Sequence, residues 1–382
     1  MTILVPAVLF AAGLGLLAEL FARYWIRRGR YFVYQPGRRD LTEFDLAIVP
    51  TCEPRAYSSI NSIGERGGEL PRGGDTFKVL LCGGSSAGCL LLDQRTSLGG
   101  VLESRLSTSD CMKECRVHVG VIGKSSVDSV TLNRILRHIL PQYELPPSEG
   151  LDAIIVLVGA SDVLRWLEMG APPERVAPAL GIDYCFEQNP EVPLSLHPRR
   201  WGLARQVSRW LSLRLRHRRN FGHRYKKARL MRANAKETRR TVPPHEVLLE
   251  SFRKNLREIL EQAQSAATVV LVARQPWFRK EDYSADELSV FWNGSVGNAY
   301  YGEATIFYAP EVISQLMSSL DAVACEVCQE LGVAAVDCGA AVPSSLENYI
   351  DQFHFTVQGS ALAADALCDG VVGELNRKGV AP

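Results

Sequence analysis

The sequence predicts an α/β domain of three layers, in which helices cover both faces of a five-stranded, mostly parallel sheet. Two observations carry this prediction. Five short, largely apolar runs alternate with longer stretches that have the spacing of amphipathic helices. Three of the runs are followed directly by glycine, at Gly83, Gly123 and Gly159, which indicates tight turns where the strands end.

The predicted strands are residues 77–82, 117–122, 153–158, 268–273 and 333–336. The predicted helices are residues 97–106, 126–140, 245–266, 310–331 and 356–375. We expect Pro141 to close the second of these helices, because proline disrupts a helix interior. Pro310 instead stands in a first turn, where its missing N–H costs little.

The N-terminus predicts a membrane anchor at residues 1–25. Residues 3–22 are apolar except for Glu19 and are long enough to cross a bilayer as a helix. Tyr24 and Trp25 follow, as expected of an interfacial aromatic belt, and Arg27, Arg28 and Arg30 come shortly after them. No charged segment precedes the apolar run and no clear cleavage site ends it, which disfavours a secretory signal peptide. The alternative is a buried N-terminal helix.

Three further segments follow the anchor. Residues 26–76, rich in Gly, Pro and Arg, are expected to be an irregular connector, and residues 77–380 form the α/β domain. A long insertion at about 164–244 separates the third and fourth strands. Although the net charge of the chain is only +1, residues 199–240 contain sixteen Lys and Arg and a single acid, Glu237.

This basic segment suits nucleic acid, anionic lipid or an anionic polymer as partner, or is a solvated excursion. No nucleic-acid-binding motif accompanies it, and we expect no nucleic acid. The predicted anchor favours a role at the membrane surface.

The ten cysteines are scattered and too few for a disulfide framework. Cys325 and Cys328, and Cys111 and Cys115, are the close pairs. Buried or surface thiols are a simpler interpretation than zinc or redox chemistry. We expect no metal and no organic cofactor.

The chemistry is indicated by a serine on a glycine turn and a late Asp-x-x-His. Ser85 lies in the run from Gly83 to Gly88, directly after the first strand, and Asp351 precedes His354 by three residues. A serine is a weak nucleophile until a histidine takes its proton and a carboxylate orients that histidine. These groups fall at the carboxyl edge of the predicted sheet, where sites of such folds lie. The pattern predicts a Ser-His-Asp hydrolase.

Two other interpretations of the glycine turn are weaker. It is not a phosphate-binding loop, because no Gly-Lys-Ser/Thr follows. Residues 83–87 nearly match the Gly-x-Ser-x-Gly elbow of α/β-hydrolases. That fold usually separates its acid and histidine by more than three residues, and its elbow follows a strand in the middle of the sheet.

These motifs resemble the SGNH (GDSL-like) hydrolase family, over about residues 61–375 with the insertion poorly covered. The family's Gly-Asp-Ser block corresponds to Gly83-Gly-Ser85, with glycine in place of aspartate, and its last block corresponds to Asp351-x-x-His354. Residues 59–67 and 252–256 are similar to the membrane-anchored branch of the family. The resemblance implies a flavodoxin-like sheet and an acyl intermediate on Ser85.

The resemblance also implies an oxyanion hole. Its donors are the backbone N–H groups of Ser85 and Gly123, together with the side chain at position 161. The family has Gly-x-Asn-Asp after the third strand, whereas this chain has Gly159-Ala-Ser-Asp162. Ser161 therefore replaces the asparagine amide with a shorter hydroxyl. Loss of one such donor typically costs about 10²–10³ in rate, so the departure is compatible with a compensating donor, a slow enzyme or lost activity.

The expected function is a membrane-anchored serine esterase or acyl hydrolase acting on an O-acylated glycan or a lipid-like ester. The alternatives are an O-acyltransferase and a non-catalytic binding or assembly protein of an envelope polysaccharide system. The membrane side is open: the arginines after the anchor favour the cytoplasm, whereas most anchored enzymes of this type face outward.

Other polar residues receive lesser roles. Arg274 and Gln275 follow the fourth strand and are expected at the substrate pocket. Asp162 is expected to anchor the loop after the third strand, and His118 and His138 are expected to be structural.

Overall fold

The computed structural model describes residues 13–22, 24, 29–71, 75–144, 150–191, 207 and 217–379. Its central sheet confirms the predicted fold class: five strands pair in parallel in the order β10-β8-β5-β3-β4. The strands are β3 (Thr76–Gly83), β4 (Arg116–Gly123), β5 (Leu151–Leu157), β8 (Ala267–Ala273) and β10 (Ala334–Val336). Every predicted strand boundary lies within two residues of the observed one.

The order of the strands fixes where a site can form. The chain steps from β3 to β4 on one side and then returns to β5 on the other, so β3 and β5 flank a topological switch point. Loops after the two strands diverge there and leave a crevice at the carboxyl edge. Gly83 ends β3 at this edge and pairs with Gly123 of β4 and with Leu157 of β5.

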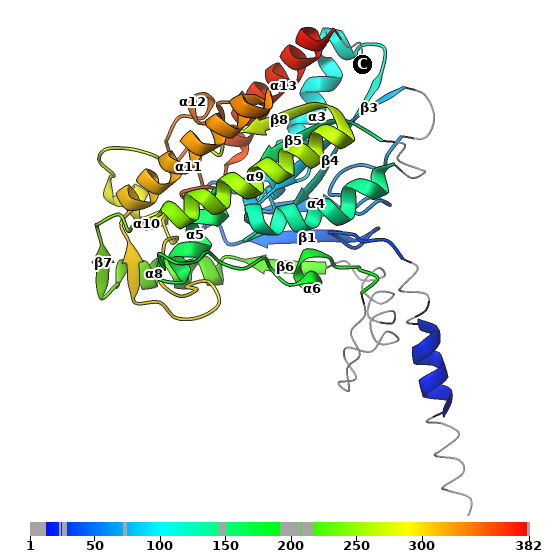
Figure 1. The fold of residues 1–382 in the computed structure, drawn as a ribbon. Coiled ribbons are helices and arrows are strands. Elements are labelled where there is room, and N and C mark those ends of the chain that lie inside the picture. Colours follow the sequence, from blue (N-terminus) through cyan, green and yellow to red (C-terminus); the bar gives the residue numbers. More distant parts are fainter. Residues whose placement is uncertain are drawn as a thin grey trace, which may run out of the picture.

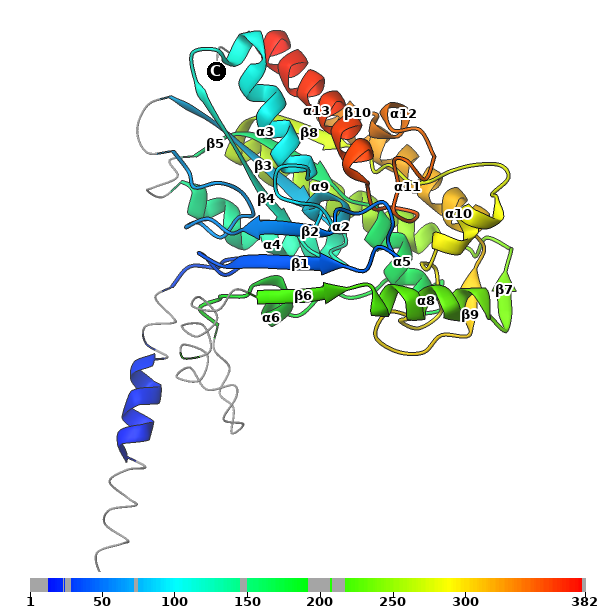
Figure 2. The same ribbon diagram turned by 180° about the vertical axis from the view of Figure 1, so that it is seen from behind.

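Helices cover both faces of the sheet. Figure 1 shows α4 (Ser129–Tyr143), α9 (Glu246–Ala266) and α11 (Pro310–Leu331) on one face, and Figure 2 shows α3 (Leu98–Thr108) and α13 (Val357–Lys378) on the other. Strand side chains alternate between the two cores. Leu80 and Cys82 of β3 join the first core, whereas Val79 and Leu81 join the second.

The prediction that Pro141 closes a helix is wrong, because α4 continues to Tyr143 with the proline inside it. The residues beyond the proline make contacts that offset its cost. Tyr143 is buried and donates to Glu65, and Gln142 Oε1 accepts from the backbone N–H of Tyr31 at 3.0 Å.

The expected irregular connector is also not what the structure shows. Residues 26–76 include β1 (Arg39–Phe44) and β2 (Arg55–Ser59), which pair antiparallel. β1 pairs in parallel with β6 (His217–Phe221) of the insertion. The connector and the insertion therefore form a second, three-stranded sheet beside the main one (Figure 2). Sequence patterns do not reveal the pairing of β1 with β6, because the two strands lie more than 170 residues apart in the chain.

The insertion is folded over much of its described length. After α5 (Ala160–Glu168) it contributes α6 (Ile182–Cys185), α8 (His223–Ala233) and β7 (Glu237–Arg239), which pairs with β9 (Ile306–Tyr308). Short helices α2 (Ser85–Gly88), α10 (Ala285–Val290) and α12 (Cys338–Ala341), the 3-10 turn Asp110–Met112 and a helical segment at residues 13–22 complete the described elements. Part of the basic run is structural: Arg232 donates to the backbone carbonyl of Tyr308 at 3.0 Å.

Residues 1–12, 23 and 25 of the predicted anchor lie outside the described residues. Of the helices that the structure describes, none combines the length and the apolar composition that a bilayer crossing requires. All ten cysteines are free thiols. Burial raises the pKa of Cys328 to about 12, as expected for a buried thiol and not for a reactive one.

Candidate active site

The turn that carries Ser85 is built from glycines because strands and helix approach one another too closely for a side chain. A Cβ at Gly83 would lie 2.0 Å from the carbonyl oxygen of Leu157, and one at Gly88 would lie 2.1 Å from that of Gly123. Ser85 is the first residue of α2 and remains half-buried. The glycines therefore bring the serine to the switch point with its hydroxyl accessible.

The structure brings the three predicted catalytic residues into one hydrogen-bonded chain. His354 Nε2 lies 2.9 Å from Ser85 Oγ, and His354 Nδ1 lies 2.8 Å from Asp351 Oδ2. If Nδ1 carries the proton and donates it to the carboxylate, Nε2 is free to accept from the serine hydroxyl. This is the tautomer that general-base activation requires.

The loop that delivers both Asp351 and His354 is closed on itself. Tyr349 and Phe355 form an antiparallel bridge, and the N–H of Ile350 donates to the carbonyl of His354 at 2.8 Å. Directly after the loop, Thr356 caps the N-terminus of α13. The three-residue spacing of Asp351 and His354 in the sequence thus corresponds to a rigid turn in the structure.

Electrostatics favour the charged carboxylate and a basic imidazole. Burial works against ionisation of Asp351, but the adjacent His354 and nearby N–H donors outweigh it and lower the carboxyl pKa to about 2. Burial likewise lowers the pKa of His354, but the Asp351 carboxylate outweighs it, so the imidazole pKa lies above its ordinary 6.5. The pair is therefore arranged to accept a proton from the serine and hold it.

One partner of Asp351 was missed by the sequence analysis. Trp292 Nε1 donates to Asp351 Oδ2 at 2.8 Å, and Oδ1 accepts from the N–H groups of Phe353 and His354 at 2.9 and 3.0 Å. Nothing in the sequence around Trp292 marks it, since it lies 59 residues before its partner.

The predicted oxyanion side lies against the same turn. Gly123 ends β4 beside Gly83. Ser161 is the second residue of α5, and the glycine before this helix, Gly159, has a φ of 133°. Ser161 Oγ lies 3.4 Å from where a Cβ of Gly84 would be. Its hydroxyl makes no hydrogen bond with any described residue, although only 8% of the residue is exposed. The hydroxyl is therefore available to a ligand.

Asp162 binds a structural partner and is not part of the proposed oxyanion hole. Its carboxylate accepts from the N–H and the hydroxyl of Ser129 at 3.1 and 2.5 Å, which ties α5 to the first turn of α4. Burial and the neighbouring Asp128 raise the pKa of Asp162. The two histidines that were expected to be structural also have partners: His118 pairs with Glu65 at 3.1 Å, and His138 contacts the carbonyl of Arg134.

The two predicted pocket residues behave differently. Arg274 is held between Asp321 and Asp337, with Nε 2.8 Å from Asp321 Oδ1 and Nη1 2.6 Å from Asp337 Oδ2. The Arg274 guanidinium thus has a structural role through these two ion pairs. Gln275 donates to the hydroxyl of Ser86 at 3.3 Å, next to the candidate nucleophile.

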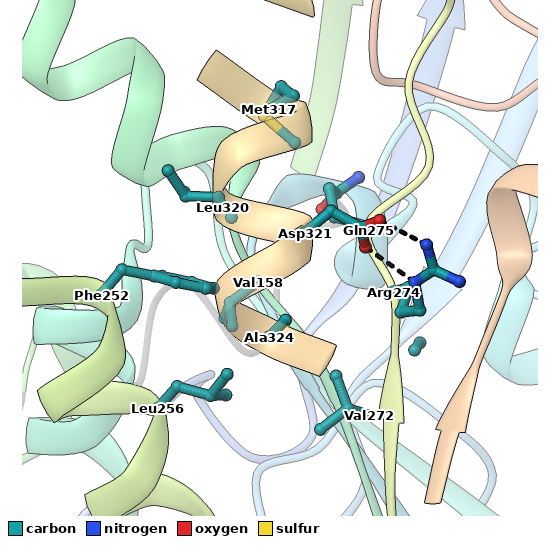
Figure 3. Close-up of a pocket in the computed structure, with 12 residues that line it drawn as sticks. Val158, Phe252, Leu256, Val272, Arg274, Gln275, Met317, Leu320, Asp321 and Ala324 are labelled. Carbon is teal, nitrogen blue, oxygen red and sulfur yellow. Dashed lines mark hydrogen bonds and ion pairs between the residues drawn. The ribbon is translucent and has the colours of Figure 1, made fainter. Parts of the chain in front are cut away.

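A small cavity lies beside these residues, between α9 and α11 (Figure 3). Its lining is mostly apolar and comprises Val158, Gly159, Phe252, Leu256, Val272, Ala273, Arg274, Gln275, Met317, Leu320, Asp321 and Ala324. Its volume is about 10 Å³, which accommodates at most one water molecule. An acyl chain does not fit there, and Ser85 is not among the residues that line this cavity.

A second support of the nucleophile turn also escaped the sequence analysis. Arg66 is 2% exposed. It donates to the carbonyls of Gly88, Cys89 and Leu92, the last two at 2.8 and 2.7 Å. Arg66 lies in the 59–67 segment that resembles the anchored branch. Its side chain therefore satisfies carbonyls at the C-terminal end of α2 and in the turn that follows it.

Comparisons with known proteins give distant matches only. No protein-family model matches the chain, and no curated protein matches it. Among solved structures, it is similar to an acetylxylan esterase from Geobacillus stearothermophilus, with 12% identity, a TM-score of 0.41, and coverage of 78% of this chain and 95% of that one. It is also similar to an alpha/beta hydrolase enzyme from the metagenome of Lake Arreo, Spain, with 11% identity, a TM-score of 0.40, and coverage of 78% and 96%.

Among the described residues, no group of three or more His, Cys, Asp or Glu side chains is placed to hold a metal ion.

Proposed function

We propose that this chain is a serine hydrolase of ester bonds that works through an acyl-Ser85 intermediate. One observation carries the proposal: the continuous chain of hydrogen bonds from Ser85 through His354 to the buried carboxylate of Asp351. A serine and a histidine with purely structural roles would not require a hydroxyl, an imidazole and a buried carboxylate to be linked in this order. The placement at the switch point of a parallel sheet supports the same conclusion.

In the first half of the reaction, Ser85 Oγ attacks the ester carbonyl while His354 Nε2 takes the hydroxyl proton. Asp351 stabilises the imidazolium that forms. The N–H groups of Ser85 and Gly123, with the Ser161 hydroxyl, donate to the developing oxyanion. The tetrahedral intermediate then collapses, His354 gives its proton to the departing alkoxide, and an alcohol leaves.

In the second half, water or another hydroxyl attacks the acyl-Ser85 ester. His354 takes the attacking proton and returns it to Ser85 Oγ. Water yields a free acid, whereas an acceptor alcohol yields a new ester and makes the protein an O-acyltransferase. The two outcomes differ only in which nucleophile enters the second half.

The first experiment is covalent labelling of the purified protein by a fluorophosphonate, together with hydrolysis of p-nitrophenyl acetate. Wild type should be labelled at Ser85 and should hydrolyse the ester, and Ser85→Ala should do neither. A folded wild type that shows no labelling and no turnover would contradict the proposal.

The substrate class follows by analogy with the resembled family, since fold alone does not determine substrate. We propose an O-acylated glycan or a lipid-like ester. Release of acetate from an acetylated polysaccharide, compared with release of fatty acid from a short-chain lipid ester, distinguishes the two. Transfer to an added sugar alcohol identifies the acyltransferase.

The alternative is a binding or assembly protein on the same scaffold, and Ser161 is the observation that favours it. A chain that no longer performs catalysis has no need of the asparagine donor. Binding of an acylated oligosaccharide by inert wild-type protein would support this alternative.

We also propose that the N-terminal segment holds the protein at a membrane. The described part of this segment, residues 13–22, exposes large apolar side chains, namely Leu14, Leu16, Leu17, Leu20 and Phe21. Deletion of residues 1–25 should release the protein from membranes. Release of the intact protein by high salt alone would contradict a spanning helix, because salt screens surface charges but does not weaken apolar insertion.

The side of the membrane is a separate question with two expectations. The arginines after the anchor favour the cytoplasm, and the family analogy favours the outside. Protease digestion of intact cells against lysed cells decides between them.

A further inference from the structure

The indole of Trp292 reaches the catalytic carboxylate from outside the turn that carries it. Its Nε1–H donates to Asp351 Oδ2 at 2.8 Å, and the same oxygen accepts from His354 Nδ1 at 2.8 Å. Asp351 itself has no exposed surface. The backbone donors of the turn serve Oδ1. His354 Nδ1 also lies 2.9 Å from Oδ1. Trp292 thus holds, from outside the turn, the carboxylate oxygen that lies 2.8 Å from the imidazole.

Trp292 is itself held by a cluster of aromatic rings. Its ring centroid lies 5.1 Å from that of Tyr225 and 5.6 Å from that of Tyr300. Tyr225 and Tyr300 contact each other edge to face at 5.6 Å. Tyr225 is buried and belongs to α8, so the insertion supplies one wall of the cluster. Contacts of this kind restrict the indole to one orientation.

We infer that Trp292 is a positioning residue of the catalytic apparatus: its indole N–H holds the Asp351 carboxylate in the orientation that aligns His354 with Ser85. The inference rests on the proposed hydrolase function. It also gives the insertion a role, because α8 keeps the indole in place through Tyr225. A tryptophan that only filled the core would have no need to aim its single donor at this oxygen.

The expected consequence is electrostatic as well as geometric. The hydrogen bond from Trp292 takes up part of the negative charge that Asp351 offers to His354. Without it, the carboxylate interacts more strongly with the imidazolium, so the pKa of His354 should rise. Three other titratable groups act on Asp351, namely Cys52, Tyr225 and Arg229. All three remain in the variants below.

The test is Trp292→Phe, which keeps an aromatic ring but removes the donor. Trp277→Phe is the matched control, because Trp277 Nε1 donates to Ser314 Oγ at 3.0 Å, with no contact to Asp351. Replacement of Trp292 by 3-benzothienylalanine, which exchanges only the N–H for sulfur, serves as the second variant should phenylalanine loosen the cluster. Thermal unfolding of each variant reports whether the fold is kept.

We expect kcat for p-nitrophenyl acetate to fall about tenfold in both Trp292 variants, with KM changed much less, because the donor acts on the base and not on the substrate. The acidic limb of the pH profile should move upward by about half a unit to one unit, as a stronger pull of Asp351 on the imidazolium predicts. Trp277→Phe should show neither effect.

The pKa of the His354 imidazole, followed by NMR, provides a readout that does not depend on turnover. His354→Gln identifies its resonances among the seven histidines of the chain. A higher pKa in the Trp292 variants than in wild type supports the inference, even for a protein that proves inert towards esters. An unchanged or lower pKa, or an equal shift in Trp277→Phe, overturns it. Absence of labelling at Ser85 in wild type would count against the hydrolase function alone.

Discussion

The two sides of the candidate site are held very differently. On the base side, both oxygens of Asp351 are hydrogen-bonded, and His354 contacts Asp351 and Ser85 at once. On the oxyanion side, Ser161 has a hydroxyl with no partner among the described residues and a shorter reach than the asparagine it replaces. The base is thus fixed more firmly than the group that must stabilise charge. If the chain is the proposed hydrolase, we expect the oxyanion side, and not the base, to limit its rate.

The largest expected effect is loss of the nucleophile. Ser85→Ala should lower kcat by about 10⁶, because serine, histidine and carboxylate act as a unit and removal of the nucleophile removes the acyl intermediate. Mass spectrometry of fluorophosphonate-treated protein measures the same loss as absence of the adduct. An Ala variant that keeps wild-type turnover would place the chemistry elsewhere.

Changes to the base should rank just below. His354→Ala should approach the Ser85→Ala loss, and Asp351→Asn should cost up to about 10⁴, since the wrong tautomer is then favoured while the shape is kept. Because the pKa of His354 is raised, wild-type activity should fall on the acidic side at a pH above 6.5. Below that pKa the imidazole is already protonated and cannot accept from Ser85. A flat profile of kcat/KM between about pH 5 and 8 would contradict this assignment.

Substitutions of Ser161, on the oxyanion side, should change kcat less than substitutions of the base, and they should raise or lower it according to the new side chain. Ser161→Asn should raise kcat about tenfold, and at most by the 10²–10³ that one full donor supplies. Ser161→Ala should lower it. KM should change less than kcat, since the donor acts where charge develops. Steady-state kinetics on p-nitrophenyl acetate measure both changes, and a folded but inactive Ser161→Asn would show that the pocket is built around the serine.

The sequence predicted the parts of the molecule in which neighbouring residues carry the information. Apolar runs, three of them followed by glycine, located all five strands of the main sheet, and the helix Pro310–Leu331 was predicted to the residue. Ser85, His354 and Asp351 were located by their place after strands and by a spacing of three. These signals are local, because turns and strand ends are set by adjacent residues.

The parts that were missed depend on contacts between distant segments. β1 and β6 lie far apart in the chain and pair across the connector and the insertion. The Trp292 donor and the Arg66 guanidinium act on groups that only the fold brings near. Arg274 was predicted at the substrate pocket because it follows a strand, and it lines the small cavity of Figure 3, but the sequence did not show that Asp321 and Asp337 bind its charge.

The smallest expected effect concerns the link between the two catalytic segments. Ser86 donates to the carbonyl of Phe353 at 3.1 Å and accepts from Gln275 at 3.3 Å, so it ties the nucleophile turn to the Asp351 loop. Ser86→Ala removes these bonds, at about 1 kcal/mol each. The loop keeps its own bridge and its helix cap. We therefore expect kcat to fall less than about tenfold, a modest effect for loss of a supporting bond.

Ser289→Ala is a suitable control, since Ser289 is exposed and donates only to the carbonyl of Asp286 among the described residues. Urea denaturation should show a lower midpoint for Ser86→Ala than for this control, and fluorophosphonate should still label Ser85. If Ser86→Ala loses labelling while Ser85→Ala keeps it, Ser86 is the nucleophile. If instead Ser86→Ala keeps labelling but loses most of its turnover, the base side depends on each single contact. The contrast between a firmly held base and a weakly held oxyanion side would then be wrong.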